Sequence, residues 1–110
     1  MDIEFGSGDY ASVFVYGLNY AISKGSRISN HSYVITAYSQ AVADAADAAE
    51  QAGHLIITSA DNFGKNRDLE PAYPTSLNND NIISVAASTI DETRMGESNP
   101  SLTSSWGPNS

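Results

Sequence analysis

Three residues near the middle of the chain have the types that nucleophilic catalysis requires. Ser59, His54 and Asp61 supply a hydroxyl, an imidazole and a carboxylate, which in a catalytic triad act as nucleophile, base and orienting acid. His54 and Ser59, however, are five residues apart in one apolar run, and side chains at that odd spacing point to opposite faces of a strand. These three residues therefore do not form a triad among themselves.

Metal chemistry has little support in the sequence. His31 and His54 are isolated from each other and are predicted to be structural or surface residues. The run Asn78–Asn81 offers oxygen ligands to calcium, but it lacks the spacing of an EF-hand loop, so a solvated turn is expected. The absence of cysteine excludes a disulfide framework and thiolate metal sites. We therefore predict no cofactor within this chain.

The charge balance limits the classes of partner. The net charge is −8, from 13 acidic and 5 basic residues. Such a surface repels phosphate backbones and anionic lipid, so we predict neither nucleic-acid binding nor membrane contact. No apolar run is long enough to span a bilayer, and the first residues lack the features of a signal peptide. Both ends of the chain read as cuts within a longer protein.

Two helices are expected. The first covers residues 9–24, with Asp9 as N-cap and Gly25 as a left-handed stop. The second is capped by Thr36 and ends at Gly53. Its apolar residues form one narrow stripe in which alanine dominates: Tyr38, Ala41, Val42, Ala45, Ala49 and Ala52. So many small side chains on one face indicate a close approach to a neighbouring layer.

Strand patterns complete an α/β fold. Arg27–Ser32 is a short polar strand candidate, whereas His54–Ala60 and Ile82–Ala87 are apolar runs typical of strands buried on both faces. Between the last two, Asp61–Asn81 has the composition of a long loop. The order helix, strand, helix, strand, loop, strand predicts a largely parallel sheet flanked by helices.

In open parallel sheets, ligands bind beyond the carboxyl ends of the strands. Here those ends are Ser32–Val34, Ala60–Asn62 and Ala87–Thr89. Geometry alone therefore directs attention to the segments that contain Ser32 and Asn62.

Six short motifs, in the right order and at plausible spacing, resemble the subtilase family of serine proteases. They are Gly17-Leu18-Asn19-Tyr20-Ala21-Ile22 followed by Gly25, Ile28-Ser29-Asn30-His31-Ser32, Leu55–Gly64, Tyr73-Pro74-Thr75, Ile82–Ala87 and Ser105-Trp106-Gly107-Pro108. None is decisive alone, but their common order over residues 11–108 argues against coincidence. The resemblance implies that residues 1–110 are part of a subtilisin-like catalytic domain, truncated at both ends.

The resemblance also assigns roles. It makes Asn62 the side-chain donor of the oxyanion hole, which stabilises negative charge on the substrate carbonyl oxygen during acyl transfer. It implies that protein or peptide substrates lie alongside the first of two pocket walls like an added strand. These walls are Ser32, Tyr33 and Val34 on one side and Ser59, Ala60 and Asp61 on the other.

Some departures from the family pattern matter. The motifs Asp-[Ser/Thr]-Gly, His-Gly-Thr and Gly-Thr-Ser-x-Ala are absent, so this piece is predicted to be inactive alone. Val34 and Asp61 stand where the family usually has glycine. We expect Asp61 to turn into the pocket, where it would attract a substrate Lys or Arg; the alternative is outward, to solvent or to a cation from the part of the protein beyond this chain.

The alternative is a non-catalytic α/β binding module, or a pseudoprotease, on the same scaffold. For a complete enzyme, the resemblance leaves open a propeptide and bound calcium, and it favours a secreted or secretory-pathway protein.

Overall fold

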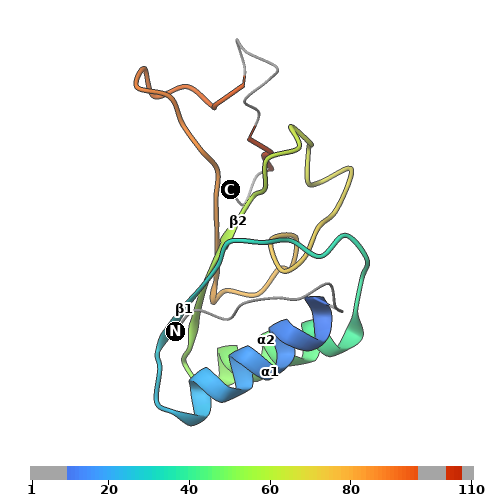
Figure 1. Cartoon of the computed structure of the whole chain (residues 1–110), viewed down its shortest axis with the longest axis vertical. Helices are drawn as coiled ribbons and strands as arrows, with labels where there is room; N and C mark the ends of the chain where they lie inside the picture. Colours follow the sequence, from blue (N-terminus) through green and yellow to red (C-terminus); the bar gives the residue numbers. More distant parts are fainter. Residues whose placement is uncertain (1–9, 97–103, 108–110) are drawn as a thin grey trace.

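The computed structural model describes residues 10–96 and 104–107. These residues form two helices and a three-stranded sheet, and Figure 1 shows the path of the chain. In chain order the elements are α1 (Tyr10–Ser23), β1 (Ile28–His31), α2 (Gln40–Gln51), β2 (Leu55–Ser59) and β3 (Ile82–Val85). The strand order is β1-β2-β3, and both pairs are parallel. The predicted α/β class and parallel sheet are confirmed. Neither helix is long and apolar enough to cross a membrane.

Helix α1 follows the predicted pattern closely. Phe14 and Leu18, four residues apart, are fully buried on one face. The helix ends as the sequence indicates, because Gly25 has φ 80° and Ser26 N–H donates to the Ala21 carbonyl at 3.0 Å. The predicted cap Asp9 lies outside the described residues.

Helix α2 buries small side chains, as expected. Val42, Ala45, Ala46 and Ala49 join the hydrophobic core, and three alanines among them let the helix lie close to α1. The predicted stripe was wrong at Ala41 and Ala52, which are exposed.

The predicted start of the second helix was also wrong. It begins at Gln40 with Ser39 as N-cap, so Thr36 is not the cap and Tyr38 lies outside it. The reason is a long-range contact that the local signal does not contain. Ile35 pairs in antiparallel fashion with Tyr73, which holds the chain extended, and the Tyr38 ring packs edge-on against Tyr73 at 5.4 Å.

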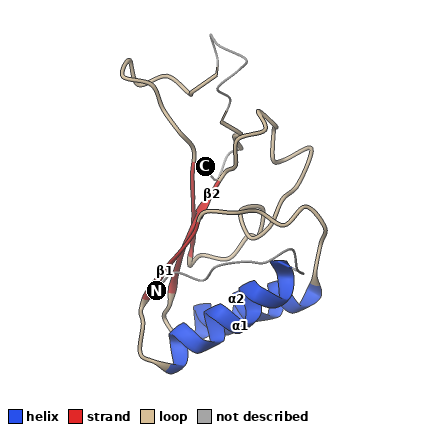
Figure 2. Cartoon of the chain, in the orientation of Figure 1, coloured by secondary structure: helices blue, strands red, loops and turns tan. Residues whose placement is uncertain are grey.

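The sheet buries one face far more than the other. Ile56 belongs to the core cluster that both helices share, and both helices lie on the same side of the sheet (Figure 2). On the opposite face, Ile83 and Val85 are 47% and 52% exposed. The expectation that Ile82–Ala87 is buried on both faces was therefore wrong for this chain. As an edge strand, β3 has only its inner face covered by described residues.

Candidate active-site groove

A groove of about 580 Å³ lies where the chain leaves β1 and β2. Six of the seven residues singled out from the sequence line it: Ser32, Tyr33, Val34, Ser59, Asp61 and Asn62. They come from two strand ends about 30 residues apart, which the parallel pairing of β1 with β2 brings together. Of the predicted walls, Ser32, Tyr33 and Val34 form the first wall, and Ser59 and Asp61 form the second wall, with Asn62 next to it.

Ala60 is the predicted site residue that does not line the groove. It is fully buried, because it continues the alternation along β2 in which Ile56 and Thr58 are buried. Sequence reasoning missed five other lining residues: Tyr10, Ile35, Thr36, Ala37 and Phe63. Four of them directly extend a predicted segment, and their adjacency was the available signal. Tyr10 comes from the start of α1, and nothing local pointed to it.

The first wall rests on a chain of hydrogen bonds that joins both histidines. His54 Nδ1 lies 2.9 Å from the Ser26 carbonyl, and its Nε2 lies 2.8 Å from the Ser29 hydroxyl. Ser29 in turn contacts His31 Nε2 at 2.7 Å, and His31 Nδ1 contacts the Tyr33 hydroxyl at 3.0 Å. Both histidines are buried, which agrees with a structural role.

The direction of this chain follows from its carbonyl end. A carbonyl only accepts, so His54 Nδ1 carries a proton. With both rings neutral, Ser29 donates to His54, His31 donates to Ser29, and Tyr33 donates to His31. Burial, with a smaller contribution from His54, lowers the pKa of His31 to about 4, and burial raises the pKa of Tyr33 to about 12. The Tyr33 side chain is therefore held to the core as a neutral donor.

Backbone pairing holds the rest of this segment. Ile35 N–H donates to the Tyr73 carbonyl, and Tyr73 N–H donates to the Ile35 carbonyl, both at 2.8 Å. Tyr73 belongs to the Tyr73-Pro74-Thr75 motif of the long loop. The long loop is thus hydrogen-bonded to the residue that directly follows the first wall.

The second wall is organised by Asp61. Its φ of 74° lies in the left-handed region, where a residue without a side chain is favoured. Its carboxylate accepts from the Phe63 N–H at 2.8 Å, from the Ser105 hydroxyl and from the guanidinium of Arg67. The ion pair is buried, with 5% of the Asp61 side chain and 10% of the Arg67 side chain exposed.

This arrangement differs from the expected pocket role of Asp61. The carboxylate is bound to a cation, but that cation is Arg67 of this chain, and neither a substrate nor the rest of the protein supplies it. Asp61 still borders the groove, while both of its oxygens are engaged by the chain itself.

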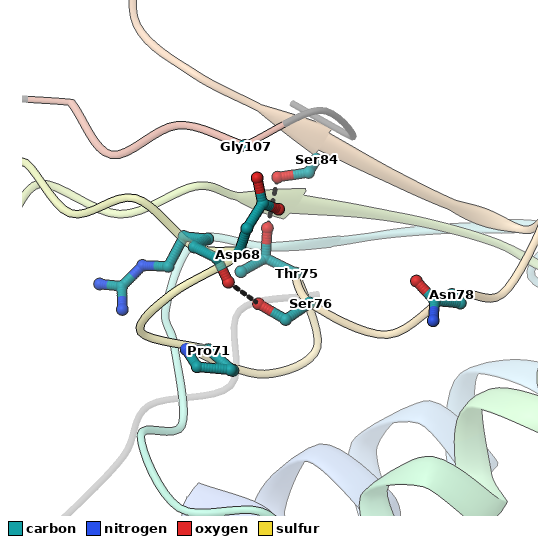
Figure 3. A pocket seen from close by; sticks show the side chains of 8 residues that line it. Asp68, Pro71, Thr75, Ser76, Asn78, Ser84 and Gly107 are labelled. Atoms are coloured by element: carbon teal, nitrogen blue, oxygen red, sulfur yellow. Dashed lines mark hydrogen bonds between the residues drawn. The ribbon is translucent and has the colours of Figure 1, made fainter.

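A second cavity, of about 240 Å³, lies beside the long loop (Figure 3). The Thr75 and Ser84 hydroxyls that line it form a hydrogen bond with each other, and the Ser76 hydroxyl donates to the Arg67 carbonyl at 3.4 Å. Its lining hydroxyls are thus used internally, and no histidine lies among the residues that form it. The groove between the two walls is the better candidate site.

Serine, histidine and carboxylate do not converge in the part of the chain that is described. Ser29 contacts both histidines, but it does not line the groove, and His54 is oriented by a carbonyl rather than a carboxylate.

No group of three His, Asp or Glu side chains in residues 10–96 and 104–107 could hold a metal ion. Within the Asn78–Asn81 run, the Asn79 amide donates to Asp47 at 2.7 Å and to Glu50 at 3.1 Å, so it fastens the long loop to α2.

A sequence model of the subtilase family matches residues 5–110. The chain belongs to the subtilase family. No curated protein matches it significantly.

Solved protease structures share the fold of this subtilase chain. A lanthipeptide protease matches with a TM-score of 0.73 at 22% identity, over 91% of this chain and 32% of its own. The epidermin leader peptide processing serine protease of Staphylococcus aureus gives 0.70 at 17%, over 96% and 30%. The prenylagaramide maturation protease gives 0.72 at 16%, over 98% and 36%. The subtilase chain thus spans about a third of the length of these proteins.

Proposed function

We propose that this chain supplies the oxyanion donor and two pocket walls of a serine endopeptidase. The observation that supports this most directly is the groove itself, because residues from two separate strand ends line one cavity and Asn62 is among them. Subtilase membership makes peptide-bond hydrolysis the reaction of the whole protein under this proposal.

In the proposed mechanism, a serine elsewhere in the protein attacks the substrate carbonyl, and a histidine elsewhere accepts the serine proton. Negative charge develops on the carbonyl oxygen, and the Asn62 amide donates to it. An amide suits this task because it donates strongly without a charge of its own. The substrate backbone lies along the first wall, and the residue before the scissile bond enters between the walls.

Substitution of Asn62 tests this role in the full-length protein. Asn62→Ala should lower kcat by about 10²–10³ and leave KM nearly unchanged, a magnitude borrowed from the corresponding deletion in subtilisin, a member of this family. Asn78→Ala is the matched control, because Asn78 is exposed on the long loop outside the groove. An effect confined to KM, or none, would remove Asn62 from the oxyanion hole.

The 110-residue chain by itself should not hydrolyse peptides. Its described residues bring no nucleophile, base and acid together at the groove, so a fluorogenic peptide should remain intact. A phosphonate directed at activated serines should leave every serine unlabelled. Specific labelling accompanied by turnover would falsify this expectation.

The alternative is a non-catalytic binding module or pseudoprotease, for which Asp61 and Val34 were the arguments. Neutralisation of Asp61 by Arg67 weakens the first argument, since the carboxylate is not an unpaired charge beside the oxyanion site. The two functions separate on one observation, namely whether the full-length protein contains the Asp-[Ser/Thr]-Gly, His-Gly-Thr and Gly-Thr-Ser motifs in that order.

A further inference from the structure

The residue directly before the proposed oxyanion donor combines a left-handed backbone with a buried charge. At a φ of 74° most side chains are strained, but an aspartate tolerates this region when its carboxylate binds nearby backbone. Asp61 meets that condition, because its Oδ1 accepts from the Phe63 N–H at 2.8 Å. The turn that presents Asn62 thus closes around the carboxylate.

A carboxylate that is 95% buried requires compensation, and Arg67 supplies it. The terminal nitrogen Nη2 contacts Asp61 Oδ2, and the terminal nitrogen Nη1 donates to the Glu70 carbonyl at 2.7 Å. Both terminal nitrogens of the Arg67 guanidinium are therefore held in place. Lys65, two residues earlier, carries the same charge but pairs with Glu70 at the surface, where its side chain is 46% exposed.

The same turn is bonded to a distant segment. Ser105 N–H donates to the Asp61 carbonyl at 3.1 Å, and Lys65 N–H donates to the Ser105 hydroxyl at 2.9 Å. Arg67 N–H then donates to the Trp106 carbonyl at 2.7 Å. Because the Ser105 hydroxyl also donates to the Asp61 carboxylate, the ion pair lies at the centre of this junction.

We propose that Arg67 is a positioning residue for the oxyanion hole, acting through Asp61. By pairing with the carboxylate, Arg67 holds it in one orientation and cancels its charge next to Asn62. Without Arg67, the carboxylate would lie unpaired beside the place where the substrate oxygen becomes negative, and it would oppose that charge. This inference rests on the proposed oxyanion role of Asn62.

A double-substitution cycle in the full-length protein tests the inference. Arg67→Gln should lower kcat by about 10- to 100-fold with KM changed less than about threefold, because the unpaired charge acts mainly on the transition state. Asp61→Asn combined with Arg67→Gln should restore kcat to within about threefold of the parent, since asparagine keeps the turn without the charge. Lys65→Gln, the matched control, should leave kcat within about twofold.

If Arg67→Gln folds, two outcomes would overturn the proposal. An unchanged kcat in Arg67→Gln would overturn the proposal, even if the melting temperature fell. A double variant as slow as Arg67→Gln would also overturn it. If Arg67→Gln does not fold, a folded and active double variant supports the proposal, and a double variant that also fails to fold overturns it.

A measurement without catalysis separates this inference from the proposed function. Melting temperatures of the parent, Asp61→Asn, Arg67→Gln and the double variant should be strongly non-additive, and this non-additivity reports the ion pair whatever Asn62 does. If Asn62→Ala leaves kcat unchanged while the cycle is non-additive, the oxyanion role fails and the pair stands. An additive cycle would instead refute the pair itself.

Discussion

The two walls of the groove are held in place by different physics. The first wall is anchored by neutral hydrogen bonds from Tyr33 through His31 into the core, and by backbone pairing of Ile35 with Tyr73. The second wall is anchored by a buried ion pair between Asp61 and Arg67. The hydrogen bonds that hold the first wall require close packing and an uncharged His31. The ion pair that holds the second wall requires both Asp61 and Arg67. Different perturbations should therefore displace the two walls.

Truncation of a core side chain next to the first wall should produce the largest loss of folding stability. Phe14 is fully buried, and its ring lies 4.9 Å from that of His31. Phe14→Ala should lower the free energy of unfolding of the full-length protein by about 3–5 kcal/mol, as measured by urea titration. Tyr16→Ala on the same helix, at a residue 76% exposed, should change it little. Equal losses would contradict the assignment of Phe14 to the core.

The second largest effect should be a loss of folding stability at acid pH, through His31 beneath the first wall. Burial depresses the pKa of His31 from 6.5 to about 4, so protons bind the unfolded chain more tightly. The stability that depends on neutral His31 is fully present above pH 6.5. It is lost as the pH falls from 6.5 to 4, by up to about 3 kcal/mol, and no further loss follows below that.

The comparison that isolates this effect is the free energy of unfolding against pH for the parent and His31→Gln, which does not titrate. The difference between the two proteins should shrink as the pH falls through this window. A difference that stays constant from pH 6.5 to 4 would show that His31 is not the titrating group.

The smallest of these effects should be the effect of an Asp61 substitution on substrate preference. Asp61→Gly removes a carboxylate that is already paired, so the kcat/KM ratio for substrates with Arg or Leu before the scissile bond should change less than about twofold. Overall turnover is expected to change, because Arg67 loses its partner. A large fall in the Arg to Leu ratio would instead return Asp61 to the pocket as a specificity residue.

Local sequence signals were sufficient where a single segment decides its own structure. The spacing of Phe14 and Leu18 predicted the buried face of α1, and Gly25 predicted its end, because a left-handed stop needs only one residue without a side chain. The order of elements predicted the parallel sheet. The sequence also identified Ser32 and Asn62 as neighbours at its carboxyl edge, which the structure brings to one groove.

Only the tertiary structure decided what depends on partners far along the chain. Thr36 has a capping side chain, yet the pairing of Ile35 with Tyr73 delays the helix to Gln40. Ile83 has the apolar character of a buried residue, yet it lies on an edge strand whose outer face the described residues leave open.

Asp61 shows the physical reason most clearly. From the sequence, its carboxylate had two directions to turn, and the pocket was the one we expected. Its partners are Arg67, six residues away, and Ser105, 44 residues away. A buried charge takes the orientation in which it is compensated, and that orientation is fixed only when the fold brings the compensating groups within reach.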